Sequence, residues 1–200
     1  MSKKKRFPIR IPRFAAGIRA QETRGAAGRS WWVKRWAESV EAMGLGARLG
    51  RGKNYALSGQ VVKLEREDGR ILAEVVGARP DPYLVTVDFR RPSADALGRI
   101  AAALRAEPML AARLLADDLP LEVGELFRAE GVDLFPGGRL DGEADGRRYD
   151  VVTSCSCPDY ANPCKHTAAV LLLLGEEIAR RPLTLVELRG ISEEELYGQV

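Results

Sequence analysis

Residues 155–166 read C-S-C-P-D-Y-A-N-P-C-K-H, and they hold every cysteine and the only histidine of the 200-residue chain. The pattern is Cys-x-Cys, six further residues and Cys-x-His, and its candidate metal ligands are Cys155, Cys157, Cys164 and His166. Three thiolates and one imidazole are the ligand set of a closed, tetrahedral zinc site. Because residues this scarce seldom fall together by chance, the stretch predicts one zinc ion bound by these four side chains.

A zinc ion held by four protein side chains has no open position for water or substrate, so the site is expected to be structural rather than catalytic. Metal binding would then contribute free energy directly to the folding of a segment with little core of its own. A redox disulfide is disfavoured, because a Cys-x-Cys disulfide is strained and the usual motif is Cys-x-x-Cys before a helix. Release of zinc on oxidation stays open as an alternative, since exposed thiolates oxidise readily.

The residues around the ligands predict a strand, a turn and a helix. Residues 148–154 read as a strand that leads into the first ligand pair, Pro158 ends it, and residues 159–163 turn the chain. A helix is expected over residues 167–180, ended by Pro182. Its apolar face consists of Ala168, Leu171, Leu172 and Leu174. One ion would therefore hold both ends of a strand–turn–helix unit.

The first 60 residues predict one helix and then irregular structure. The helix is expected over residues 30–43, with Ser30 as its N-cap. Buried packing is favoured over base stacking for its apolar face. That face consists of Trp32, Trp36, Val40 and Met43. Residues 48–55 read as a basic loop broken by glycines.

The middle of the chain predicts a small antiparallel sheet followed by helices. Strands are expected at residues 60–65, 70–76 and 83–89, with a hairpin turn at Glu67-Asp68-Gly69. Helices follow over residues 93–116, interrupted at Pro108, and over residues 121–130.

The bulk composition is that of a soluble globular protein, with 46% hydrophobic and 30% charged residues. The longest apolar run, residues 168–174, is too short to span a bilayer, and no signal peptide is visible. Cysteines that fit metal better than disulfides indicate a reducing compartment. We therefore expect a cytoplasmic protein, with nucleoid association as an option, and neither a membrane nor a small-molecule substrate as partner.

The charge is divided unevenly along the chain. Residues 1–53 hold fourteen Lys or Arg and three Glu, whereas the remainder holds 17 basic and 25 acidic side chains. Such a basic arm is expected to attract polyanions, so nucleic acid is the favoured partner, and a solvated arginine-rich tail is the alternative. The candidate nucleic-acid-binding residues are Lys3, Lys4, Lys5, Arg6, Arg10, Arg13, Arg51, Lys53 and Lys165.

The ligand pattern, running into an apolar helix, resembles the SWIM zinc finger. Further stretches are similar to bacterial SWIM proteins associated with Swi/Snf-type helicases. They are Trp31-Trp32 with Trp36, Gly50–Ala56, Gly59-Gln-Val61, Gly69, Pro82-Tyr83 and Leu134-Phe-Pro136. The resemblance implies a ββα finger, zinc at the four matched positions, and a role in nucleic-acid or protein interaction. The chain has no phosphate loop of its own, so any helicase action would belong to a partner.

Together these features predict an α+β fold: a small antiparallel β-meander with helices, plus a C-terminal ββα zinc-finger module. The expected segments are a basic, mobile arm (1–29), a helix and meander (30–92), a helical segment (93–140), the SWIM zinc finger (141–182) and a tail (183–200).

The expected function is that of a non-enzymatic, zinc-binding adaptor that binds nucleic acid, a helicase-type partner, or both. An enzyme is disfavoured because the only histidine is committed to zinc and no carboxylate cluster has metal-ligand spacing. The alternative is a pure protein-interaction module that docks through the acidic C-terminal half, at Glu176, Glu177 and Glu193–Glu195.

Overall fold

Four strands form one antiparallel sheet in the order β1-β2-β3-β4. The computed structural model describes residues 15–21, 30–67, 69–136 and 150–197. The strands are β1 (Val61–Glu67), β2 (Arg70–Val75), β3 (Tyr83–Phe89) and β4 (Val151–Cys155). The first three are the predicted meander, and β4, which comes some sixty residues later, pairs with β3 from Phe89↔Val151 to Val85↔Cys155. The strand that carries the first metal ligand is therefore an edge strand of the main sheet.

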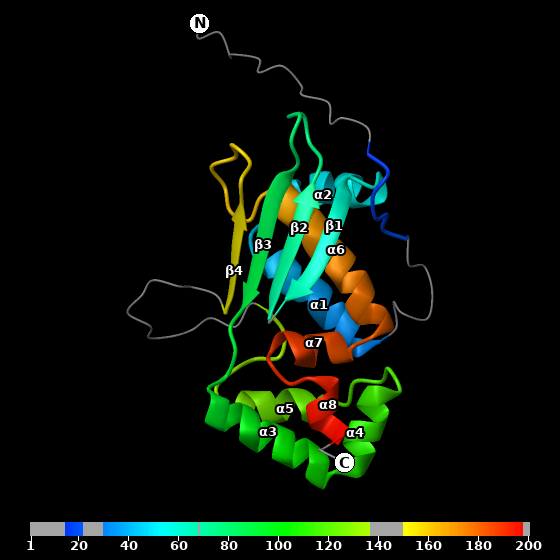
Figure 1. Ribbon diagram of the computed structural model, residues 1–200, viewed down its shortest axis with the longest axis vertical. Coiled ribbons are helices and arrows are strands. Elements are labelled where there is room, and N and C mark those ends of the chain that lie inside the picture. The colour runs from blue at the N-terminus through cyan, green and yellow to red at the C-terminus, as the bar shows by residue number, and fades with distance from the viewer. Residues whose placement is uncertain (1–14, 22–29, 68, 137–149, 198–200) are drawn as a thin grey trace, which may run out of the picture.

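The sheet has one covered face and one open face, as the alternation along β3 shows. Val85 and Val87 are buried, whereas Leu84 between β2 and β4 is 60% exposed. Three helices, α1 (Trp31–Ala42), α2 (Ala47–Leu57) and α6 (Lys165–Arg180), lie behind the sheet in Figure 1 and cover its apolar face. Strands β3 and β4 with α6 make up the expected ββα unit, but its first strand belongs to the meander. Finger and meander consequently share one core.

Helix α2 corrects the expectation of a loop over residues 48–55. Glycines at 50 and 52 weaken the local helix propensity, but Tyr55 and Ala56 bury against the core, and tertiary packing overrides the propensity. Gly52 is required at this contact: a Cβ there would lie 2.4 Å from the Ala168 Cβ and 2.9 Å from the Lys165 carbonyl oxygen. Helix α2 therefore approaches the N-terminal end of α6 more closely than a side chain would allow.

The tryptophans of α1 are packing residues, as predicted. Trp36 is buried, its Nε1 donates to the Leu171 carbonyl oxygen of α6 at 3.2 Å, and its ring stacks on Phe89 of β3. Trp32 is also buried. Trp32 and Trp36 thus pack α1 onto the core, and their buried rings are not available to stack on bases.

A second group of helices lies below the sheet in Figure 1. It consists of α3 (Ala94–Ala106), α4 (Pro108–Leu115), α5 (Leu121–Ala129) and α8 (Glu193–Tyr197). The predicted helical stretch is confirmed with its break, since Ser93 caps α3 through a bond from the Ala96 amide and Pro108 starts α4. Helix α7 (Leu183–Leu188) connects this group to the sheet, and five of its six residues are buried. Part of the expected C-terminal tail is thus core.

Two further segments complete the described chain. Within the expected mobile arm, residues 15–21 pack against the body: Gly17 N donates to Gly59 O, Ile18 bridges to Val61, and Ala20 N donates to Ala56 O. Residues 1–14 and 22–29 of that arm lie outside the described residues. Among the described residues, no helix combines the length and the apolar character needed to cross a membrane.

Candidate metal centre

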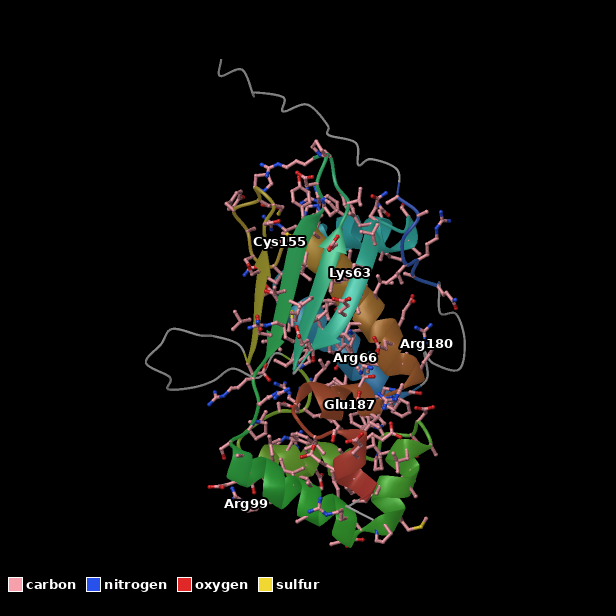
Figure 2. All side chains as sticks on the ribbon, in the orientation of Figure 1. Lys63, Arg66, Arg99, Cys155, Arg180 and Glu187 are labelled. Carbon is pink, nitrogen blue, oxygen red and sulfur yellow. The ribbon has the colours of Figure 1, made fainter. Side chains whose placement is uncertain are left out.

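The four candidate ligands converge where β4 ends and α6 begins. Cys155 is the last residue of β4, Cys164 is the N-cap of α6, and His166 is the second residue of that helix. The ligand atoms of Cys155, Cys157, Cys164 and His166 all lie within 4.8 Å of one another. Figure 2 shows Cys155 at the upper end of the sheet, far from the lower helical group.

The spacing of the donor atoms fits a tetrahedral zinc ion. His166 Nδ1 lies 3.8 Å from Cys155 Sγ and 3.7 Å from Cys164 Sγ. A sulfur at about 2.3 Å and a nitrogen at about 2.0 Å on one tetrahedral ion are roughly 3.6 Å apart. Cys164 and His166 are buried, while the other two cysteines are partly exposed. The predicted ligand set therefore holds one structural zinc.

The chain from Cys155 to Cys164 is held to the sheet by hydrogen bonds near both of its ends. Asn162 exchanges two bonds with Thr153 of β4, one of them from the Thr153 hydroxyl at 2.7 Å. Ser156 bonds to the backbone of Leu84 in both directions, through its amide at 3.0 Å and its hydroxyl at 2.9 Å. The segment that connects Cys157 to Cys164 is thus attached to the sheet as well as to the metal ligands.

The positions of the cysteine sulfurs change their pKa values in a way that bears on metal binding. A hydrogen bond from the Cys155 thiol, against the opposing effect of burial, lowers the pKa of Cys164, and the same bond raises the pKa of Cys155. Cys164 also lies at the N-terminus of α6, where the helix dipole favours an anion. Binding of a divalent cation completes the deprotonation, so zinc affinity is expected to fall in acid.

Two tyrosines enclose the imidazole. The ring of Tyr83 lies 4.5 Å from that of His166, and the ring of Tyr55 lies 5.1 Å from it, centroid to centroid. Burial, followed by the charges of Tyr83, Cys157 and Cys164, raises the pKa of Tyr55 to about 12, so its phenol stays neutral at physiological pH. Gly77 leaves room for this arrangement, because a Cβ there would lie 2.3 Å from the Tyr83 ring.

The comparisons with known proteins agree with this geometry. Residues 149–175 match the family described as the SWIM zinc finger, so this segment is a SWIM-type zinc finger. The chain as a whole is similar to the uncharacterized protein Rv2102 of Mycobacterium tuberculosis, with 35% identity over 193 residues that cover 96% of this chain. The match covers 66% of that relative, so the chain spans just under two thirds of its length. No solved structure matches the chain.

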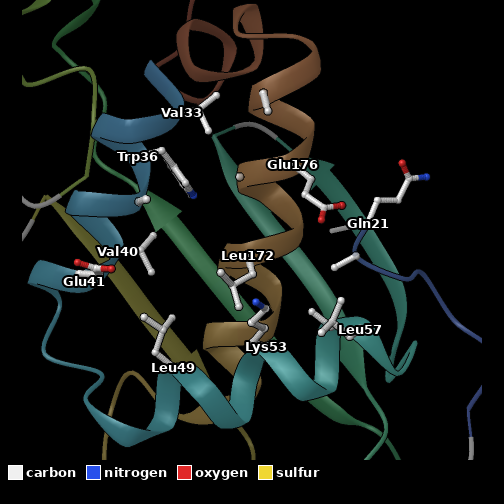
Figure 3. Close-up of a pocket in the computed structure, with 15 residues that line it drawn as sticks. Gln21, Val33, Trp36, Val40, Glu41, Leu49, Lys53, Leu57, Leu172 and Glu176 are labelled. Carbon is white, nitrogen blue, oxygen red and sulfur yellow. The ribbon is translucent and has the colours of Figure 1, made fainter. Parts of the chain in front are cut away.

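The predicted nucleic-acid-binding residues do not all lie together. Lys165 is beside the metal centre, with its Nζ 5.5 Å from the centre of the Tyr55 ring. Arg51 is exposed on the flank of α2 that carries Tyr55, whereas Lys53 lines an apolar groove of about 400 Å³ between α1, α2 and α6, on the other flank (Figure 3). The predicted arm residues Lys3, Lys4, Lys5, Arg6, Arg10 and Arg13 lie outside the described residues.

Several residues near the centre escaped the sequence analysis. Arg48 lies over the ring of Tyr160 at 5.9 Å, and Arg79 lies over the ring of Tyr83 at 5.8 Å. Positions 48, 51 and 55 have the i, i+3, i+7 spacing of one helix flank, which could have grouped Arg48 with Arg51 and Tyr55. A helical spacing has no meaning in a loop, so the prediction of a loop over residues 48–55 left these residues ungrouped.

Proposed function

We propose that this protein is a non-catalytic adaptor that binds nucleic acid through the surface around its zinc centre, assisted by the basic N-terminal residues. The observation that supports the proposal is a set of three cation–aromatic pairs. They are Arg48 with Tyr160, Arg79 with Tyr83, and Lys165 with Tyr55, at 5.9, 5.8 and 5.5 Å. Four separate segments supply these side chains, and the zinc ligands and the sheet position those segments.

Cations interleaved with aromatic rings suit a polyanion that also carries planar bases. A recess of about 240 Å³ adjoins the centre, and Tyr55, Tyr83, Asp159 and Lys165 are among the residues that line it. Cys157 and His166 also line it, so two of the metal ligands contribute to the proposed contact surface. The zinc centre would thus act by shaping this surface, and not by chemistry.

The absence of catalysis is part of the proposal. All four zinc positions are supplied by protein atoms, so no position is left to activate water.

A salt titration with paired variants tests the proposal. Fluorescence anisotropy would measure the affinity for labelled DNA and RNA, single-stranded and double-stranded, as salt is raised. The double variant Arg48→Gln/Arg79→Gln should weaken binding and reduce the salt slope by roughly 0.7 for each lost contact to a single strand. The control, Arg99→Gln/Arg113→Gln, removes the same charge from α3 and α4 in the lower helical group, where Figure 2 labels Arg99, and should bind like the wild type. If the protein bound neither DNA nor RNA at low salt, the proposal would be refuted.

A protein partner, including a helicase-type motor, is the second candidate. The observation that favours it is the open face of the sheet, where Leu84 is 60% and Val152 is 43% exposed. The acidic surface expected to dock such a partner is partly used within the chain. Glu177 pairs with Arg66 at 3.2 Å, and Glu193 pairs with Arg181 at 2.7 Å. Isolation of the protein from its own cells, with and without nuclease treatment, would separate a direct protein partner from one bridged by nucleic acid.

A further inference from the structure

One aromatic ring departs from the packing of all the others. Nine phenylalanine, tyrosine and tryptophan side chains are described, and only Tyr160 is exposed. Its exposed fraction is 96%, so the ring stabilises the fold very little. A lone exposed apolar side chain is ordinary on a protein surface, so the exposure alone carries no argument. The argument comes from the way in which the surrounding loop holds this ring.

Tyr160 is presented by a short, fixed loop. It follows Cys157 by three residues and precedes Cys164 by four, so both neighbouring segments end in zinc ligands. The carboxylate of Asp159 accepts a bond from the Ala161 amide at 3.2 Å, and Asn162 is bonded to Thr153 of β4. The loop conformation on both sides of the ring is thereby set before any ligand arrives, which limits the entropy lost on binding.

The surroundings favour stacking over simple charge attraction. Arg48, Arg51, Arg79 and Lys165 bring four positive charges to this end of the molecule. Asp81, Asp159 and the zinc centre, with a net charge of about −1 for three thiolates and one divalent ion, offset most of them. The local charge is then small, so most of the attraction for phosphates is assigned to the residues that precede α1, because residues 1–29 hold nine Lys or Arg and one Glu. What this end of the molecule adds is a ring with a guanidinium beside it.

We propose that Tyr160 is a stacking platform for an unpaired nucleic-acid base, with the Arg48 guanidinium beside it, so that the protein prefers single-stranded over double-stranded nucleic acid. In a duplex each base is already stacked on its neighbours and offers only its edge in a groove, which a ring on a short loop cannot use. A single strand offers free base faces, and base–aromatic stacking tolerates any sequence. This inference rests on the proposed function and names its ligand class.

The experiment uses the full, zinc-loaded chain and three labelled probes of equal length: a single DNA strand, the same sequence as RNA, and the DNA duplex. Tyr160→Ala should weaken binding of the single DNA strand at least about fivefold, while Tyr160→Phe should bind like the wild type. The loss should leave the salt slope unchanged, because no phosphate contact is removed. Duplex affinity should stay within about twofold. Met109→Ala, which trims another exposed apolar side chain at 73% exposure on α4, is the matched control.

Each outcome decides a separate point. Equal loss on single strand and duplex, or no loss on Tyr160→Ala with zinc content unchanged, would overturn the platform while leaving the proposed function standing. A larger loss on RNA than on DNA, or the reverse, would support the platform and identify the preferred strand. No binding of any probe by the wild type at low salt would remove the proposed function, and the platform with it.

Discussion

The rings of Tyr83 and His166 lie 4.5 Å apart at an interplanar angle of 33°, and this contact takes the place of the usual hydrogen bond to a zinc-binding histidine. His166 Nδ1 faces the cysteine sulfurs. Its buried Nε2 has no hydrogen-bond partner among the described residues. A metal-ligating histidine normally donates its second ring N–H to an oxygen, which fixes the ring. Here packing between Tyr83 and Tyr55 fixes it.

Loss of the Tyr83 ring should therefore weaken the metal site, although Tyr83 touches no metal. We expect Tyr83→Ala to lower zinc affinity by roughly tenfold or more, the usual effect of removing a group that orients a ligand. Tyr83→Phe keeps the ring and should leave zinc affinity close to that of the wild type. Competition with a fluorescent zinc chelator measures both. If Tyr83→Phe were as damaging as Tyr83→Ala, the phenol oxygen and not the ring would hold His166.

The contact between α2 and α6 yields a prediction with a control in the same helix. Gly52→Ala places a Cβ 2.4 Å from Ala168 Cβ and within 3.0 Å of the α6 backbone, so it should destabilise the fold by about 1–3 kcal/mol. Gly50→Ala meets no atom within 4 Å and should be neutral or stabilising by up to about 1 kcal/mol. Urea unfolding followed by tryptophan fluorescence would measure both. Similar effects for the two variants would contradict the close approach.

The buried Arg189 joins the sheet to the lower helices. Its guanidinium pairs with Asp150 and donates to the carbonyl oxygens of Arg90, Leu134 and Phe135, with none of its side chain exposed. Arg189→Met removes a buried charge partner and should cost about 3–5 kcal/mol. Arg181→Met, the control, breaks the ion pairs with Glu187 and Glu193 at an arginine that is 33% exposed, and it should cost about 1 kcal/mol or less. Equal costs in thermal or urea unfolding would show that Arg189 is not a structural junction.

Glu187 makes stability depend on pH in a defined direction. Burial raises its pKa, but the hydrogen bonds and charges of Arg181 and Arg66 outweigh burial, and the pKa of Glu187 is lowered overall. A carboxyl whose pKa is lower in the folded state stabilises the fold above its unfolded pKa of about 4.3, and this contribution disappears as pH falls through the folded value.

The difference in unfolding free energy between the wild type and Glu187→Gln should therefore be largest near neutral pH, at about 1 kcal/mol or less, and shrink towards zero below about pH 4. Taking the difference at each pH cancels the acid loss of zinc, which both proteins share. Glu122→Gln on α5 controls for removal of a carboxylate elsewhere. A difference that grows as the pH falls would contradict the ion-pair account.

The metal centre could be predicted from the sequence because its information is local. Cys155, Cys157, Cys164 and His166 lie within twelve residues, and their spacing and chemistry leave few alternatives. The strands, the capping by Ser93 and the break at Pro108 were predictable for the same reason, because each depends on neighbouring residues.

What could not be predicted depends on contacts between distant segments. Helix α2 contains two glycines and forms because Tyr55 and Ala56 bury against elements more than a hundred residues later. The shared sheet needed the pairing of Cys155 with Val85, which no local pattern encodes. The enclosure of His166 by Tyr55 and Tyr83 can be inferred only when helix α2 and the pairing of β3 with β4 are both known. The surface around the zinc was hidden for that reason.

The central claim is that one zinc ion, bound by three sulfurs and one histidine nitrogen, shapes this end of the molecule. Metal analysis with zinc X-ray absorption on the purified, unmodified chain tests it most directly. We predict one zinc per chain, three sulfurs at about 2.3 Å and one nitrogen at about 2.0 Å. Cys164→Ser should lose the metal, whereas Ser154→Ala, beside the site on β4, should keep it. Well under one zinc per chain, or a coordination shell with fewer sulfurs and a bound water, would contradict the account.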